Sequence, residues 1–229
     1  MMNTTKNTIC TNEIPVVFED EDILVINKPV GILSENSQKG EQGILTYLQN
    51  ENRKELYLLH RLDREVGGVM VFAKNKKSAS ALSTDIANGK FYKSYLAVTD
   101  GIPENDEGTY KDLLFKDSKK NRSFVVNRMR KGVREASLEY VVLKKNEKNA
   151  LVRVLLHTGR THQIRVQFSS RKTPLTGDGR YGSKVRDCSI ALYSHKISFN
   201  HPMTKERVEF ISNPDFNIYP WNLGSVDNA

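Results

Sequence analysis

The sequence contains only two cysteines, Cys10 and Cys188, in 229 residues. They show neither a metal-binding nor a redox spacing, so we expect no structural disulfide and no thiol chemistry. The five histidines are dispersed along the chain, and no His/Cys/Asp group has the spacing of metal ligands. The sequence therefore predicts no metal site.

Long hydrophobic runs are also missing. No apolar stretch approaches the ~20 residues of a membrane-spanning helix. Residues 1–12 are polar and rich in Thr and Asn, without the apolar centre of a signal peptide. We therefore expect a cytoplasmic protein with a flexible tail over residues 1–12. The glycine-rich stretch 174–182 lacks the Lys-Ser/Thr ending of a P-loop, which leaves nucleotide hydrolysis without support.

Hydrophobic residues make up 38% of the chain, and the formal net charge is +8. The hydrophobic share is enough for one large domain or two small lobes. The positive charge indicates a polyanionic partner such as a nucleic acid. Basic residues crowd one central segment: Lys116, Lys119, Lys120, Arg122, Arg128, Arg130, Lys131 and Arg134. This segment is predicted to be a hairpin or loop that faces nucleic acid, with a solvated surface loop as the alternative.

Alternating and continuous apolar patterns predict the secondary structure. Strands are expected at 16–19, 23–29, 57–59, 68–74, 93–98, 136–143, 150–156, 190–199 and 208–211, and helices at 42–50 and 78–88. Residues 101–132 show little periodicity and are interpreted as an inserted loop or hairpin. Trp221 is expected to pack the C-terminal end against the body.

Asp63 lies in the densest motif, between two predicted strands and between Arg61 and Arg64. Nearby positive charge favours the ionised form of a carboxylate, and an ionised carboxylate can attack carbon. Considered alone, the motif is more typical of a solvated surface ion-pair cluster, and the rest of the chain favours the reactive carboxylate. Asp63 is the residue that we expect to react.

A second dense motif covers residues 155–167, where a strand runs into a glycine turn and then into a helix. We expect this helix to begin near Thr161, whose hydroxyl can cap it. Free amides at the helix start, together with Arg160, are typical of an anion site. His162 and Arg165 are three residues apart and share a helix face, so one of them can meet Asp63 across a cleft. A capped surface helix with solvated arginines is the alternative.

Five motifs occur in an order that resembles the RluA-type pseudouridine synthase family. They are Ile26-Asn27-Lys28-Pro29-Val30-Gly31, His60-Arg61-Leu62-Asp63, Lys93-Ser94-Tyr95-Leu96-Ala97-Val98, Thr158-Gly159-Arg160-Thr161-His162-Gln163-Ile164-Arg165 and Pro174-Leu175-Thr176-Gly177-Asp178. The resemblance covers about residues 16 to 212. None is decisive alone, but five in order make coincidence very improbable.

The resemblance implies an α+β fold with a central mixed, mainly antiparallel sheet, flanked by helices and loops and split by an RNA-binding cleft. It implies isomerisation of uridine to pseudouridine in ribosomal or transfer RNA. This reaction oxidises nothing and transfers no group to another molecule, so no cofactor or metal is required. The catalytic unit is expected over residues 13–222 with a basic insertion around 101–134, followed by a tail at 223–229. A monomer without an obligate protein partner is expected.

The same resemblance assigns roles to residues. The catalytic aspartate of the family corresponds to Asp63, the active-site tyrosine to Tyr95, and the arginine that pairs with the aspartate to Arg165. Arg61 corresponds to the arginine that fills the gap left by a flipped nucleotide, and Ile164 is a candidate apolar floor for the base. Further RNA contacts are predicted at four basic residues and one histidine: Lys119, Lys120, Arg122, Arg160 and His162.

Two departures from the family pattern keep alternatives open. The family usually has Thr-Ser-Gly where this chain has Val66-Gly67-Gly68, so two hydroxyls are missing and a looser loop is expected. The first motif lies close to the start of the sequence, so we expect no S4-like RNA-binding domain ahead of it. The altered triplet is the only support for one alternative, a catalytically weak or inactive RNA-binding or RNA-folding homologue. A glycosidic-bond hydrolase is another, although it needs a second carboxylate as acid.

Overall fold

A computed structural model describes residues 14–50 and 55–223 of the chain. The tail predicted over residues 1–12 and most of the tail predicted from residue 223 lie outside the described residues. Leu223 is described and packs, together with Trp221, against the buried residues of the central strands. Trp221 is 9% exposed, as expected for a side chain that holds the C-terminal segment against the body.

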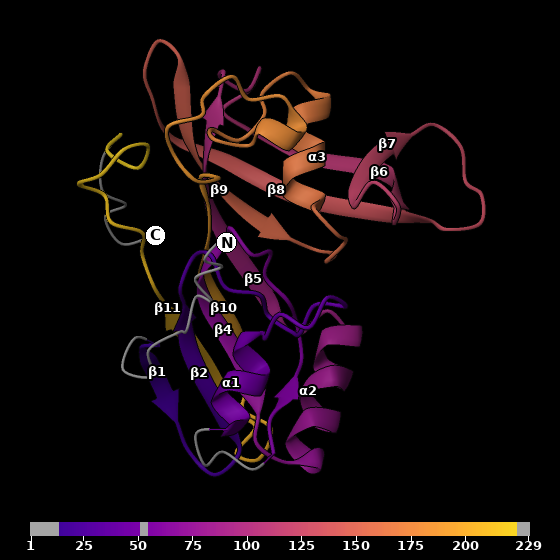
Figure 1. Ribbon diagram of the computed structural model, residues 1–229, viewed down its shortest axis with the longest axis vertical. Coiled ribbons are helices and arrows are strands. Elements are labelled where there is room, and N and C mark those ends of the chain that lie inside the picture. The colour runs from indigo at the N-terminus through magenta and orange to yellow at the C-terminus, as the bar shows by residue number, and fades with distance from the viewer. Residues whose placement is uncertain (1–13, 51–54, 224–229) are drawn as a thin grey trace, which may run out of the picture.

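The fold is built on one 11-stranded sheet (Figure 1). Its strands follow the order β1 (Val16–Glu19), β2 (Ile23–Lys28), β4 (Gly67–Ala73), β10 (Leu192–Asn200), β5 (Tyr92–Asp100), β9 (Asn149–Leu156), β8 (Val133–Lys145), β6 (Glu107–Asp117) and β7 (Arg122–Val126). Two further strands pair outside this path, β3 (Tyr57–Leu58) with β4 and β11 (Arg207–Ile211) with β10. β4 and β10 are parallel and the other paired strands are antiparallel. The predicted α+β class with a mixed, mainly antiparallel sheet is confirmed.

Helices cover both faces of the sheet in the half that contains β2 and β4. Side chains alternate between the two faces along a strand. Ile26 packs in the cluster that includes Ile44 of α1 (Ile44–Asn50), whereas Val25 packs in the cluster that includes Leu82 of α2 (Lys76–Ala87). The other half carries α3 (Gln163–Ser170) and a short 3-10 turn, η2 (Gly179–Tyr181). Within the described residues, no helix is long and apolar enough to span a membrane.

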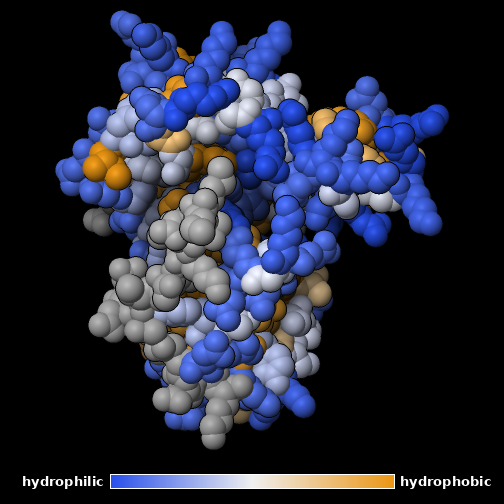
Figure 2. Space-filling model, in the orientation of Figure 1, coloured by the Kyte–Doolittle hydropathy of each residue, from blue (hydrophilic) through white to orange (hydrophobic). Residues whose placement is uncertain are grey.

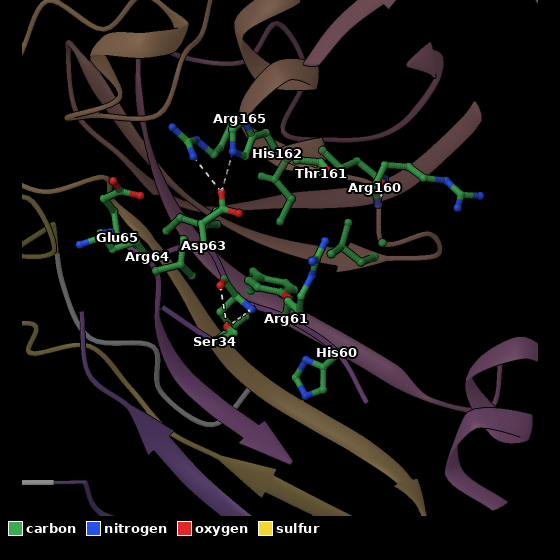
Figure 3. A pocket seen from close by; sticks show the side chains of 18 of the residues that line it. Ser34, His60, Arg61, Asp63, Arg64, Glu65, Arg160, Thr161, His162 and Arg165 are labelled. Carbon is green, nitrogen blue, oxygen red and sulfur yellow. Dashed lines mark hydrogen bonds and ion pairs between the residues drawn. The ribbon is translucent and has the colours of Figure 1, made fainter. Parts of the chain in front are cut away.

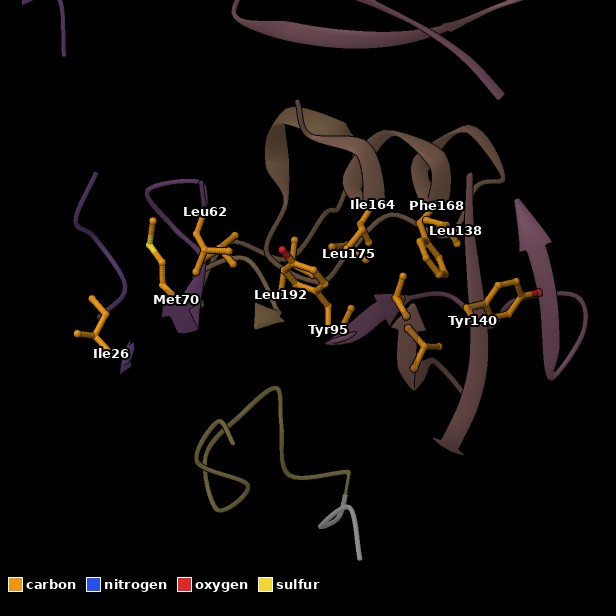
Figure 4. Packing of buried hydrophobic residues seen from close by; sticks show 14 of the residues in the cluster. Ile26, Leu62, Met70, Tyr95, Leu138, Tyr140, Ile164, Phe168, Leu175 and Leu192 are labelled. Carbon is orange, nitrogen blue, oxygen red and sulfur yellow. The ribbon is translucent and has the colours of Figure 1, made fainter. Parts of the chain in front are cut away.

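Strand β5 is buried on both faces. Tyr95 and Ala97 belong to the main core cluster (Figure 4), and Leu96 and Val98 belong to the cluster that Trp221 closes on the opposite face. Antiparallel sheets often expose one face to water, but the C-terminal segment covers the second face here. Strand β5 is therefore a rigid central element, and it carries Tyr95.

The basic segment around residues 101–134 is part of the sheet. β6 and β7 form an antiparallel hairpin, and β6 also pairs with β8 over nine residue pairs from Glu107↔Val141 to Phe115↔Val133. The hairpin prediction is confirmed, but the low periodicity hid the 11-residue strand β6 and the five-residue strand β7. The connection between β7 and β8 projects from the side of the molecule (Figure 1), and hydrophilic side chains cover most of it (Figure 2).

Candidate active site

A cavity of about 980 Å³ opens between the two halves of the molecule. One wall is the loop between β3 and β4, and the opposite wall is the turn between β9 and α3 together with the first residues of α3. Tyr95 of β5, Ile164 of α3 and Leu192 of β10 line the cavity and also belong to the main core (Figure 4). The cavity thus has an apolar floor beneath walls that carry charged side chains.

Asp63 lies on the β3–β4 loop with 28% of its side chain exposed. The loop is fixed from below by Ser34, whose hydroxyl donates to the Leu62 carbonyl at 2.7 Å and accepts from the Leu62 amide at 3.0 Å (Figure 3). The Val66 amide donates to the Asp63 carbonyl at 3.0 Å. These bonds hold the backbone on both sides of Asp63, so its carboxylate is presented from a defined position.

The residues that replace the family's hydroxyls are also well held. Val66 is buried in the main core. A Cβ on Gly67 would lie 3.1 Å from Cγ2 of Val30, and one on Gly68 would lie 2.2 Å from the Ser194 carbonyl oxygen. Gly68 has φ +113° and lets β10 approach β4 in parallel register, a conformation that favours glycine. Packing therefore restrains this loop where the expectation was a looser one.

Lys28 is buried beneath the same loop. Its ammonium donates to the carbonyls of Pro29 at 2.9 Å, Ile32 at 2.7 Å and Arg64 at 3.4 Å. Burial lowers the pKa of Lys28 to about 8, although the nearby charge of Asp63 opposes the shift. Lys28 therefore ties the loop that follows β2 to the loop that carries Asp63.

Arg165 is the cation that contacts Asp63. Its Nη1 donates to Oδ2 of Asp63 at 2.8 Å (Figure 3). Its Nε and Nη2 donate to the fully buried carboxylate of Asp178 at 2.6 and 3.0 Å. Burial opposes the charge of the guanidinium, but the two carboxylates outweigh it and raise the pKa of Arg165. A permanently charged donor is therefore aimed at Asp63.

His162 is the second group near Asp63, with Nε2 at 3.7 Å from Oδ2. The Ser123 amide donates to the Tyr181 hydroxyl at 2.8 Å, and that hydroxyl lies 2.9 Å from Nδ1 of His162. Tyr181 therefore anchors the Nδ1 side of the imidazole, and Nε2 faces Asp63. Burial lowers the pKa of His162, so the neutral ring predominates at neutral pH.

The two arginines beside Asp63 in sequence turn away from it. Arg61 forms an ion pair with Glu35, and Arg64 forms one with Glu41. The expectation that these neighbours hold Asp63 ionised is corrected, since the contacting cation is Arg165 from another element. Sequence adjacency misled here because successive side chains on an extended loop point in different directions.

The helix of the second dense motif, α3, begins close to the predicted place, but Thr161 does not cap it. α3 begins at Gln163, and His162 occupies its N-cap position with φ 53° and no side-chain cap bond. Among the described residues, the Thr161 carbonyl, not its hydroxyl, forms a hydrogen bond: it accepts from the Ser123 hydroxyl at 2.6 Å. The left-handed backbone at His162 turns the imidazole toward Tyr181 and Asp63 instead of extending the helix.

Ile164 and His162 meet at the cavity with Asp63, Tyr95 and Arg165, as predicted. Arg61 and Arg160 lie at its exposed margin, where Nε of Arg160 donates to the Glu135 carbonyl at 2.9 Å. Lys119 and Lys120 are exposed in the turn between β6 and β7. They do not line the cavity.

Arg122 packs with its guanidinium 5.0 Å from the Tyr181 ring and 5.4 Å from the Phe124 ring. It is therefore linked to the site through Tyr181.

Asp178 and Ser34 were not predicted from the sequence as site residues. Asp178 was noted only within a glycine-rich motif of the resemblance, and no role was assigned to it. The available signal was a carboxylate between two glycines in that motif. Ser34 carried no signal in the sequence.

Sequence spacing predicted no metal ligands, yet the fold brings three such groups together. Atoms of Asp20, Asp22 and His201 lie within 4.8 Å of one another. Their atoms are already used: His201 Nε2 lies 2.9 Å from Asp20 Oδ2, and Asp22 Oδ1 accepts from Ser78 at 2.7 Å and from Asn75 at 3.0 Å. This arrangement ties β10–β11 to the β1–β2 turn and to α2.

The sequence matches the family model described as RNA pseudouridylate synthase over residues 22–170. An uncharacterized RNA pseudouridine synthase of Aquifex aeolicus is 34% identical, over 91% of this chain and 72% of that protein. The ribosomal large subunit pseudouridine synthase C of Buchnera aphidicola is 32% identical, over 90% of this chain and 68% of that protein. The tRNA pseudouridine synthase C of Pasteurella multocida is 26% identical, over 92% of this chain and 98% of that protein.

The solved structure of human RNA pseudouridylate synthase domain containing 4 superposes with a TM-score of 0.73 at 23% identity, over 88% of this chain and 89% of that one. This likeness shows the same fold. The relatives are named as synthases, so they do not support the alternative that this chain only binds RNA. The chain belongs to the RNA pseudouridylate synthase family, whose enzymes isomerise uridine to pseudouridine within RNA.

Proposed function

We propose that this chain isomerises uridines in structured ribosomal or transfer RNA, with Asp63 as the reacting carboxylate. The observation that carries the proposal is the 2.8 Å bond from Arg165 to Asp63 above an apolar cavity floor. The substrate class follows the names of the relatives, of which one acts on the ribosomal large subunit and another on tRNA. The catalytic unit in this proposal extends over residues 13–222.

The reaction breaks the bond from ribose C1′ to N1 of uracil, joins C1′ to C5 and releases the C5 proton. A carboxylate can serve as a nucleophile at C1′ or at the ring, or as a base on the sugar. All three routes need Asp63 ionised and oriented. Arg165 orients Asp63 through the bond from Nη1, and its own position is fixed by Asp178.

Tyr95 has the role of a stacking surface in this proposal. Burial, assisted by the charge of Asp63, raises the pKa of its phenol above the ordinary value. The phenol is therefore neutral at neutral pH and a poor acceptor for the C5 proton. An aromatic ring beside Ile164 on the cavity floor instead suits the flat face of a uracil.

A uridine within paired or stacked RNA reaches this cavity only after flipping, which costs roughly a few kcal/mol. Arg61 would offset part of this cost by entering the vacated position. Its ion pair with Glu35 must then break. His162 and Arg160 would contact the flipped nucleotide and its neighbours from the opposite wall.

The hairpin formed by β6 and β7 would bind the RNA backbone. Lys119 and Lys120 at its turn are exposed and have no carboxylate partner within the described residues. Lysines of this kind position RNA through phosphates without reading its sequence. Arg122 would act closer to the site, since it stacks on Tyr181.

The test is tritium release from RNA labelled at uridine C5, using total RNA from a host that lacks the gene. Wild type and Asp63→Asn would be compared, with Asp85→Asn on α2 as a matched control outside the cavity. We expect release by wild type and by Asp85→Asn, and none by Asp63→Asn. Release by Asp63→Asn at the wild-type rate would remove Asp63 from the reaction.

A further inference from the structure

Lys93 is, like Arg165, a cation that lines the cavity and is withdrawn from solvent. It lies on β5 two residues before Tyr95, so both side chains project from the same face of the sheet into the cavity. Arg61, Arg64 and Arg165 each have a carboxylate partner. Lys93 is partly buried, and its ammonium has no hydrogen-bond or ion-pair partner among the residues that the structure describes.

The ammonium of Lys93 lies between the two walls of the cavity. A Cβ placed on Gly159, in the turn after β9, would be 3.3 Å from the Lys93 Nζ. Gly159 therefore leaves room for this ammonium. On the other side is His60, whose pKa falls to about 3 through burial and the positive charge of Lys93. The His60 Nδ1 is buried without a partner in the described structure.

An unpaired, partly buried cation destabilises a folded protein, because burial removes water without supplying a counter-charge. Burial accordingly lowers the pKa of Lys93. A hydrophobic residue at this position would avoid the cost. A positive charge at position 93 is therefore best explained by an anionic ligand that binds in the cavity. Uracil and ribose are neutral, so the anions that RNA brings into the cavity are its phosphates.

We propose that Lys93 binds a backbone phosphate of the RNA next to the flipped uridine. The inference rests on the proposed function, since it names a contact of the same site. The phosphate fixes the nucleotide from the side of β5, while Asp63 and Arg165 face the sugar and base from the two walls of the cavity. The flipped uridine is then held at its phosphate, above the ring of Tyr95.

The test compares wild type with Lys93→Met, Lys93→Arg and Lys148→Met. Lys148 is an exposed lysine in the β8–β9 turn, outside the cavity, and serves as the matched control. Filter binding of C5-tritiated total RNA is measured across a range of salt concentrations. Tritium release and thermal unfolding are measured on the same preparations.

For Lys93→Met we expect roughly 10-fold weaker binding at low salt. The slope of log affinity against log salt should be shallower by about 0.7–0.9, the value for one phosphate contact. Lys93→Arg should keep the wild-type slope, and Lys148→Met should keep both affinity and slope. The melting temperature of Lys93→Met should equal or exceed that of wild type, because the unpaired charge is gone.

A wild-type slope in Lys93→Met would overturn the proposal. A lowered melting temperature of Lys93→Met would indicate a structural role for the lysine. In that case Lys93→Arg is the deciding variant: a wild-type salt slope in Lys93→Arg would support phosphate binding, and a shallower slope would refute it. The two proposals fail separately. Tritium release by wild type with an unchanged slope in Lys93→Met refutes only the Lys93 contact. A changed slope without release by wild type refutes the isomerase and keeps the contact.

Discussion

The carboxylate of Asp178 binds Nε and Nη2 of Arg165 at 2.6 and 3.0 Å. Both side chains are almost fully buried, at 0% and 4% exposure. Two parallel charge-assisted bonds fix the plane of a guanidinium, which leaves Nη1 directed at Asp63. The position of the proposed reacting carboxylate is therefore set by a residue that does not touch the cavity.

Asp178→Asn keeps the shape of the side chain but weakens its hold on Arg165. We expect the single-turnover rate of tritium release to fall by roughly 10–100-fold, as when a group that orients an active-site residue is lost. Asp112→Asn is the control, because Asp112 binds Arg171 at 3.0 Å outside the cavity. Equal rate losses in both variants, measured on folded protein, would contradict a positioning role for Asp178.

Ser34→Ala removes both bonds to the backbone of Leu62 and leaves two buried polar groups without partners. The free energy of unfolding should fall by ~1–3 kcal/mol. The maximal rate should fall by about 10–100-fold because Asp63 is displaced, with KM nearly unchanged. Ser34→Thr, which keeps a hydroxyl, should recover part of the rate, and Ser37→Ala in the same loop should match wild type. A change in KM alone would contradict this account.

Gly68→Ala should unfold the protein or destabilise it by more than about 3 kcal/mol, because the new Cβ would lie 2.2 Å from the Ser194 carbonyl oxygen. Gly31→Ala is the matched control. Gly31 has φ +94° but nothing within 4 Å of an added Cβ, so only backbone strain of ~1–2 kcal/mol applies. Chemical denaturation measures both changes. Equal losses would show that steric overlap with β10 is unimportant.

Glu35→Gln frees Arg61 from its ion pair. Exposed ion pairs contribute only ~0–1 kcal/mol, so we expect RNA affinity to rise by no more than about fivefold. Glu209→Gln breaks an exposed pair with Lys196 outside the cavity and corrects for the change in net charge. An affinity gain equal to that of Glu209→Gln would mean that Arg61 is not held back by Glu35.

His60 should make stability sensitive to acid. Its pKa is about 3 in the folded protein against 6.5 when free. Between these values unfolding takes up a proton, so the free energy of unfolding falls as the pH is lowered. His60→Gln should flatten the decline in melting temperature from about pH 7 to about pH 5, whereas the exposed His157→Gln should not. Burial also lowers the pKa values of His162 and His195. The melting temperature of His60→Gln should therefore still decline in part as the pH is lowered.

Local patterns in the sequence predicted most of the elements. Alternation marked β5, and the apolar run after Asp63 marked β4, because burial imposes a period of two along a strand. The same method failed at the basic segment, where β6 shows mixed exposure along its length. It also assigned the cap of α3 to Thr161, whereas His162 occupies that position with a left-handed backbone and no side-chain cap bond.

The sequence by itself determined the family, the fold class and the loop that carries Asp63, since ordered motifs and residue periodicity are properties of the chain alone. Only the tertiary structure decided which partners reach that loop. Asp178 and Ser34 come from distant segments, and the loop backbone turns Arg61 toward Glu35. Side-chain direction and long-range contact depend on sheet register and packing, and no local pattern encodes them.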